Sequence, residues 1–108
     1  MSNDLIAIDT KTGTGAAINI SLGWIPDRVE VVNVTDGDTV DIWYRGMTNG
    51  TSISIVLAAA TRATNGISEY AGTATAAPGF TIGSDISETA KVLRWCAMRN
   101  DARLFSAA

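Results

Sequence analysis

The stretch "RVEVVNVTDGDTVDIWYRG", residues 28–46, decides the fold. Two runs rich in β-branched and aromatic residues flank an Asp-Gly dipeptide, and each run has the composition of a β-strand. Asp-Gly between two such runs predicts a hairpin, because Gly37 tolerates the positive φ that a tight turn demands. Before the turn, the valines change phase near Val31–Val32. Either a β-bulge at that point or burial on both faces of the strand accounts for the change.

The residues after the turn alternate between the two faces of the predicted strand. One face carries Val40, Ile42 and Tyr44, and the other carries Asp41, Trp43 and Arg45. Because Trp43 shares its face with two charged residues, we expect its ring to be partly exposed.

Outward from the hairpin, strand patterns recur every dozen or so residues, separated by Gly, Asp, Asn and Thr. The further strands are expected at 16–22, 52–57, 67–72, 80–84 and 90–98. In the first of these, the apolar residues alternate with Asn19 and Ser21, as in a half-buried strand.

The segments between these strands have turn or loop signals. Pro26 in "GWIPD" has no N–H, so residues 23–27 are expected to form a turn or a sheet corner. Residues 58–66 are consistent with a short helical turn or a loop, and residues 73–79 with an exposed loop.

Seven or eight short strands without helical periodicity predict an all-β protein. The expected architecture is an antiparallel β-sandwich, jelly-roll-like, or a small barrel, with minimal helix. The 108 residues suit one domain. We expect an N-terminal arm or edge strand at 1–15, the β-sandwich domain at 16–99 and a C-terminal tail at 100–108.

Composition excludes several classes of function. The net charge is −3 and there is no basic run, so we expect no nucleic-acid partner. The longest apolar run, residues 53–60, is too short to span a membrane, and the first residues lack a secretory signal pattern, so folding in a cytoplasm is expected. Charged residues are only 18% of the chain. Either some surface is hidden against a partner, or the chain is simply a small Ala-rich domain.

No motif in the sequence supports catalysis. The chain has no histidine, which removes Ser-His-Asp and Cys-His nucleophile pairs and most transition-metal sites. The cluster of Asp36, Asp38 and Asp41 fails the EF-hand spacing, because the twelfth position is Met47, and it is interpreted as solvated turn acids. "GFTIGSD", residues 79–85, lacks the Gly-Lys-Ser/Thr of a phosphate-binding loop and is expected to deliver the chain into the last strand. We expect no enzyme activity, cofactor or metal.

The single cysteine and the aromatic residues complete the candidates. Cys96 lies between hydrophobic neighbours and is expected to be buried and inert, and Trp95 is expected in the core. Aromatic residues and arginine are enriched at protein interfaces, so Trp24, Trp43 and Arg45 are the candidate interface residues.

Three stretches resemble small virion structural proteins of tailed bacteriophages: "GAAINISLGWIPDRVEVVN" (15–33), "TNGISEYAG" (64–72) and "GFTIGSDI…KVLRWCAMR" (79–99). In these proteins a strand precedes a Gly-aromatic-x-Pro-Asp turn, here 23–27, and a valine-rich strand follows it. A Gly-Phe-Thr-x-Gly segment, here 79–83, leads into the last strand. The motifs are structural turns, and they span most of the chain in order.

The resemblance implies a head decoration (cement) protein that binds the major capsid protein on the outer surface of the capsid. Such proteins are often trimers, so the resemblance also implies a homotrimer, made in the host cytoplasm and located on the virion. The alternative is a tail-fibre or receptor-binding module that recognises carbohydrate through Trp24 or Trp43.

Overall fold

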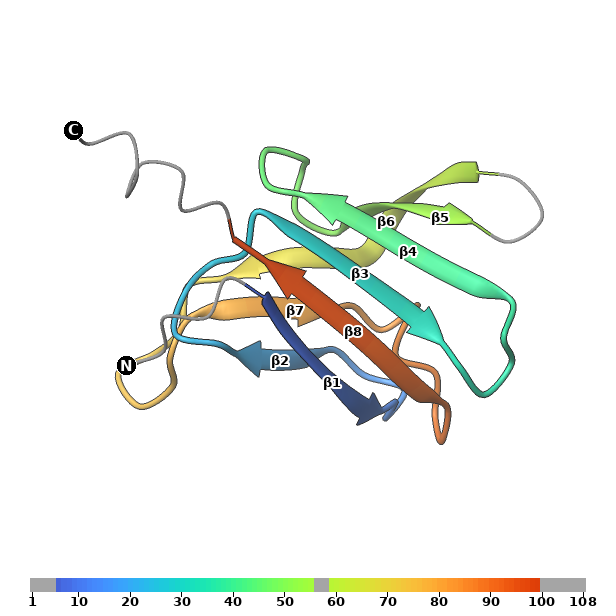
Figure 1. Cartoon of the computed structure of the whole chain (residues 1–108), viewed down its shortest axis with the longest axis horizontal. Helices are drawn as coiled ribbons and strands as arrows, with labels where there is room; N and C mark the ends of the chain where they lie inside the picture. The colour runs from blue at the N-terminus through green and yellow to red at the C-terminus, as the bar shows by residue number, and fades with distance from the viewer. Residues whose placement is uncertain (1–5, 56–58, 100–108) are drawn as a thin grey trace.

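The computed structural model describes residues 6–55 and 59–99, and these residues form eight antiparallel strands in one sheet without a helix (Figure 1). The strands are β1 (Ile6–Thr12), β2 (Ile18–Ser21), β3 (Arg28–Asn33), β4 (Thr39–Tyr44), β5 (Thr51–Ile55), β6 (Ala59–Tyr70), β7 (Gly79–Ile82) and β8 (Val92–Met98). The all-β antiparallel prediction is confirmed.

The sheet curls over into an open half-barrel. Its strand order is β1-β8-β3-β4-β5-β6-β7-β2, so β1 and β2 are the two edges. In Figure 1, β1, β8, β3 and β4 form a front layer, and β6, β7 and β2 lie behind it. The first two strands of the chain therefore lie at opposite edges of the sheet. Side chains fill the space between the two layers.

The hairpin predicted from residues 28–46 is present as β3 and β4. Six residue pairs follow one another without a register shift, and Gly37 in the turn has a φ of 69°. The pairing of β3 with β4 therefore contains no bulge, which was one explanation for the phase change between Val31 and Val32. Val31 is buried in the core, whereas Val32 is half-buried on the opposite face. The strand buries side chains on one face and partly covers them on the other.

The expectation of a helical turn or loop at 58–66 is wrong, because these residues belong almost entirely to the long strand β6. The pairing of β6 with β5 contains a register shift: Thr51 faces Ile67, while Ser52 faces Arg62. Asn65 has a φ of 54°, which lets the strand bulge there. Ladder bonds from residues 59–62 to β5 outweigh the helix preference of the alanines.

The core lies between the two layers and is built mainly from inward-facing residues of the sheet. Its buried side chains include Trp24, Val29, Val31, Trp43, Ile67, Phe80, Ile82, Ile86, Leu93, Trp95 and Ala97. The rings of Phe80 and Trp95 meet edge to face, with centroids 5.3 Å apart. The expected core position of Trp95 is confirmed.

The remaining segments agree with the sequence where the structure describes them. Residues 6–12 form an edge strand that pairs with β8. Residues 23–27 form the expected corner, and residues 71–78 form a loop. Residues 1–5 and the tail at 100–108 lie outside the described residues.

Candidate interaction surface

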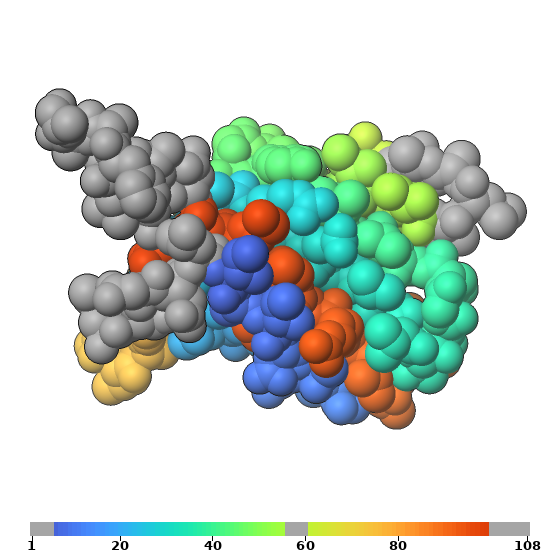
Figure 2. Space-filling view, viewed as in Figure 1, coloured from blue at the N-terminus to red at the C-terminus, as the bar shows by residue number. Residues whose placement is uncertain are grey.

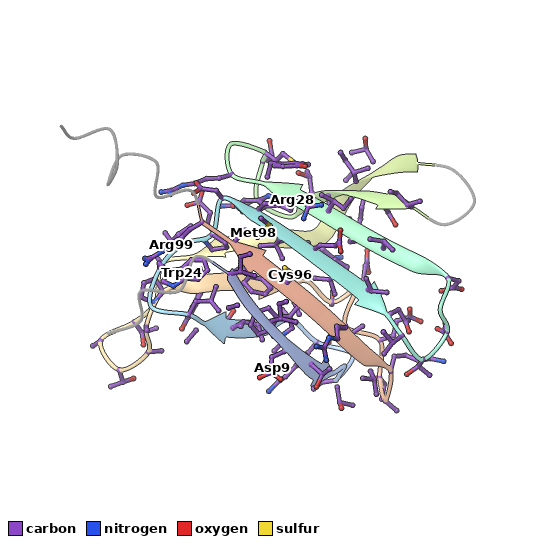
Figure 3. The ribbon with its side chains drawn as sticks, viewed as in Figure 1. Asp9, Trp24, Arg28, Cys96, Met98 and Arg99 are labelled. Atoms are coloured by element: carbon purple, nitrogen blue, oxygen red, sulfur yellow. The ribbon has the colours of Figure 1, made fainter. Side chains whose placement is uncertain are left out.

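The structure does not gather the three candidate interface residues at one exposed site. Trp43 is fully buried, so its predicted partial exposure is wrong, and it cannot contact a partner. Trp24 is only 9% exposed, and the guanidinium of Arg99 lies 5.1 Å from the centroid of its ring (Figure 3). Arg45 is exposed, 3.7 Å from the carboxylate of Asp27. Of the three, Arg45 has the most exposed side chain, at 48%.

The error at Trp43 comes from assigning the wrong face of β4 to the core. The sequence pattern gives the alternation but not its direction. In the structure Asp41 and Trp43 point inward, and Val40, Ile42 and Tyr44 point outward. The aliphatic residues of β4 are therefore on the outside of the sheet, while its tryptophan is in the core.

The same outward side collects the exposed apolar residues of the whole sheet. Among the described residues, seven large apolar side chains are 36% to 55% exposed: Ile6, Ile8, Val34, Tyr44, Ile53, Ile55 and Val92. Six of the seven belong to β1, β4, β5 and β8, and Val34 directly follows β3, which lies between β8 and β4 in the sheet. We call this side of the five strands the outer apolar face; Figure 2 views the molecule from the side of its front layer.

Strand register aligns these side chains in rows across the sheet. One row is Ile8, Cys96, Glu30, Ile42 and Ile53. The next row is Thr10, Arg94, Val32, Val40 and Ile55. The apolar side chains of the two rows are neighbours on β4 and β5, while Glu30 and Arg94 interrupt the rows on β3 and β8. A cluster of exposed apolar side chains on one side of a small protein favours an interaction site.

The charged residues of the outer apolar face include the pair of Arg28 and Glu30 and the exposed Arg94. Arg28 donates to Tyr44 Oη from Nε at 3.2 Å and to Glu30 Oε2 from Nη2 at 3.1 Å. The hydrogen bond to Tyr44 is the largest of the effects that raise the pKa of Arg28 above its ordinary value. The guanidinium also lies 5.6 Å from the centroid of the Tyr44 ring. These contacts hold the charge flat against the sheet.

An open hollow borders the outer apolar face at one end. Its volume is about 340 Å³, and it is lined by Asp27, Arg28, Tyr44, Met98 and Arg99. Figure 3 shows Arg28 and Met98 on the adjacent strands β3 and β8. The hollow gives the face a contour that a protruding side chain of a partner can fill.

Cys96 lies on this face, opposite Glu30 and Ile8 in the strand register. It is half-buried, so the expectation of a buried thiol is wrong. The residue before it, Trp95, takes the core position.

The main polar cluster of the interior surrounds Asp41, which is 1% exposed. Arg62 donates from Nε to Asp41 Oδ2 at 2.7 Å and from Nη2 to Oδ1 at 3.3 Å. Ser52 Oγ donates to Oδ2 at 2.6 Å, and Ser54 Oγ to Oδ1 at 3.4 Å. The interpretation of Asp41 as a solvated turn acid is therefore wrong. The hydrogen bond that Arg62 donates to Asp41 is the main cause that raises the pKa of Arg62 above its ordinary value.

This cluster borders a small cavity of about 40 Å³, lined also by Asp85 and Glu88. That volume admits water molecules, whereas small-molecule sites usually measure 300 Å³ or more. We therefore interpret the Asp41–Arg62 pair as structural.

The segment "GFTIGSD" forms no phosphate cradle. Residues 79–82 are strand β7, and the amide of Ser87 donates to the carbonyl of Gly83 within the turn that follows. A Cβ at Gly83 would lie 2.0 Å from the carbonyl oxygen of Asn65, so this glycine allows two backbone segments to approach closely. The expected turn into the last strand is confirmed.

The described ranges 6–55 and 59–99 contain no group of three or more Cys, Asp or Glu residues placed to hold a metal ion. No helix of a length and hydrophobicity able to cross a membrane occurs in the same ranges.

Comparison with known proteins gives no relative. No protein-family model matches the chain, and neither a curated protein nor a solved structure is significantly similar to it.

Proposed function

We propose that the chain is a structural protein of a phage virion, which decorates the outside of the capsid and stabilises the shell through its outer apolar face. The observation that carries the proposal is the collection of all seven exposed large apolar side chains on one side of the described sheet. A surface of that kind fits a broad protein partner better than a small ligand. The resemblance of residues 15–99 to small virion proteins names the major capsid protein as that partner.

The mechanism follows from burial and copy number. Covering exposed isoleucine and valine side chains stabilises a contact by about 25 cal/mol for each Å² of apolar surface removed from water. A decoration protein that spans a joint between capsid subunits adds this contribution at every joint. Many such contacts on one shell add up, even when each is weak.

The receptor-binding alternative loses the residues on which it depended. Carbohydrate recognition by stacking needs an exposed aromatic ring, whereas Trp43 is fully buried and Trp24 is 9% exposed. Tyr44 is 47% exposed, but its hydroxyl accepts a hydrogen bond from Arg28 within the outer apolar face. The buried tryptophans favour the capsid proposal over the tail proposal.

Copy number in purified virions tests the proposal. Quantitative mass spectrometry relative to the major capsid protein is expected to give hundreds of copies, near a simple ratio to that protein. A handful of copies, in multiples of three or six, would move the protein to the tail. Its complete absence from virions would overturn both virion functions.

A further inference from the structure

A second surface lies along the free edge of β1. This strand pairs with β8 on one side only, over seven consecutive residue pairs without a register shift. It contains no proline and no bulge, two of the devices by which proteins block unwanted pairing at a sheet edge. The other edge strand, β2, has only four residues. The β1 edge is therefore the longer and more regular template for an added strand.

Two backbone hydrogen bonds fix which backbone groups of β1 point to the free edge. The amide of Gly13 donates to the carbonyl of Lys91, at 2.7 Å, so odd-numbered residues of β1 face β8. From the other side, the carbonyl of Val92 accepts from Val34 at 3.0 Å, so even-numbered residues of β8 face β3. Both observations require the even-numbered residues of β1 to direct their N–H and C=O groups outward.

The outward groups belong to Ile6, Ile8, Thr10 and Thr12. The amide of Thr10 supports this direction, because it donates to the side chain of its own neighbour, Asp9 Oδ1, at 2.7 Å. Ile6 and Ile8 have the greatest exposure of any large apolar side chain in the described sheet, at 49% and 55%. A strand added here would pair with the outward backbone groups, replace the hydrogen bond from Thr10 to Asp9, and place its own side chains beside both isoleucines.

The side chains of β1 select the occupant. Asp9 and Lys11 share the opposite side of the strand from the isoleucines, and both are exposed. Consider a second copy of β1 placed antiparallel, with Thr10 facing Thr10. Asp9 of each copy then faces Lys11 of the other, so two opposite-charge pairs form across the two-fold axis. Opposite charges directly across an antiparallel pair are stabilising, and like charges are destabilising.

We propose that the β1 edge binds the β1 edge of a second copy of this chain in antiparallel register, centred on Thr10. The contact joins two half-barrels into one continuous sheet and brings their outer apolar faces side by side, as an isologous dimer requires. It gives a dimer where the resemblance implies a trimer. The pairing does not depend on a capsid, so its failure leaves the proposed function standing, and the reverse also holds.

Charge exchange at Asp9 and Lys11 tests both the occupant and the register. Sedimentation equilibrium of the full chain is expected to give twice the 11.3 kDa chain mass. Asp9→Lys places lysine opposite lysine, and Lys11→Asp places aspartate opposite aspartate. Each variant alone is expected to self-associate about tenfold more weakly, from the usual size of cross-strand charge effects at two symmetric pairs. An equimolar mixture of the two is expected to recover the two-chain mass, because each lysine again meets an aspartate.

Two further variants separate the edge from general effects of charge and folding. Asp38→Lys makes the same charge change in the exposed β3–β4 turn and is expected to remain a dimer. Ile8→Pro removes an outward N–H while keeping the bonds of β1 to β8, so it is expected to give a folded monomer. A wild-type chain that is monomeric at every concentration, or that has the mass of three chains, would overturn the pairing. So would a mixture of Asp9→Lys and Lys11→Asp that stays monomeric.

Discussion

The substitution Arg62→Ala is expected to lower the free energy of unfolding by about 3 kcal/mol. Removing one member of a buried ion pair costs about 3 to 5 kcal/mol, because the other charge is left without its partner in a place that water reaches poorly. The lower end applies here, since the side chain of Arg62 is 22% exposed and the hydroxyls of Ser52 and Ser54 still donate to Asp41. A domain of this size has about 5 to 15 kcal/mol of stability in total, so the loss is large.

Urea unfolding, followed by tryptophan fluorescence, measures this loss, and the melting temperature is expected to fall by about 12 °C. The matched control is Arg94→Ala, because Arg94 is exposed on the outer apolar face and its loss is expected to change stability by less than about 0.5 kcal/mol. In the double variant Asp41→Ala with Arg62→Ala, no charge is stranded. The loss in free energy of unfolding of the double variant is expected to be about 2 kcal/mol smaller than the summed losses of the two single variants.

Two results would refute the reasoning about the ion pair. If Arg62→Ala is no less stable than Arg94→Ala, the ion pair contributes nothing to stability, although Asp41 is buried. If the two single variants add within about 0.5 kcal/mol, Asp41 and Arg62 are not coupled, and each side chain contributes through separate contacts.

Three other predictions concern stability. Trp43→Ala is expected to lower the free energy of unfolding by about 3 to 5 kcal/mol, measured in urea, because it leaves a cavity at a fully buried site. Arg45→Ala is expected to be nearly neutral in the same assay. Equal effects of the two substitutions would contradict the burial of Trp43. Gly83→Ala is expected to be more destabilising than Gly37→Ala in the same assay, because a Cβ at Gly83 would lie 2.0 Å from a carbonyl oxygen. A Cβ at Gly37 meets no neighbouring atom, so that substitution costs only the strain of its positive φ, about 1 to 2 kcal/mol. The reverse order of stability would be inconsistent with this geometry. Lys91 Nζ donates a hydrogen bond to Asp36 Oδ1 at 2.9 Å, and this bond raises the pKa of Lys91 above its ordinary value of 10.5. The stabilising contribution of the charged lysine is therefore complete below pH 10.5 and is lost as the pH rises through the raised pKa of the folded state. Lys91→Met is therefore expected to melt below the wild type at pH 7 by a margin that shrinks above pH 10.5, and a margin that grows there would contradict the sign.

The sequence predicted the fold well where turn chemistry and period-2 alternation coincide. The hairpin at 28–46 is the best case, because Asp36-Gly37 fixes the turn and the flanking strands need only local information. The failure at 58–66 has a physical cause. The intrinsic preference of alanine favours helix, but residues 59–62 pair with β5, and the same strand continues into residues 67–70, which pair with β7. This pairing decides the conformation, and the propensity of the segment alone does not reveal it.

The candidate site was harder to predict because alternation does not say which face is buried. Trp43 and its charged neighbours looked like an exposed face, yet Asp41 is buried through its pairing with Arg62, which lies 21 positions later. The size of the Trp43 ring was a signal for the core that the neighbouring charges obscured. In the same way, the alternation of Ile53 and Ile55 with serines predicted a strand but not that the isoleucines would face outward.

We propose above that the outer apolar face binds the capsid. The most direct test measures how variants with one added charge bind to shells that lack this protein. Ile53→Glu places a carboxylate within the row that crosses five strands, and Ala74→Glu places the same carboxylate on the exposed 71–78 loop, away from the face. Co-sedimentation with shells is expected to show wild-type binding for Ala74→Glu and binding weakened about tenfold or more for Ile53→Glu. If Ile53→Glu binds shells as tightly as Ala74→Glu, the outer apolar face is not the docking surface.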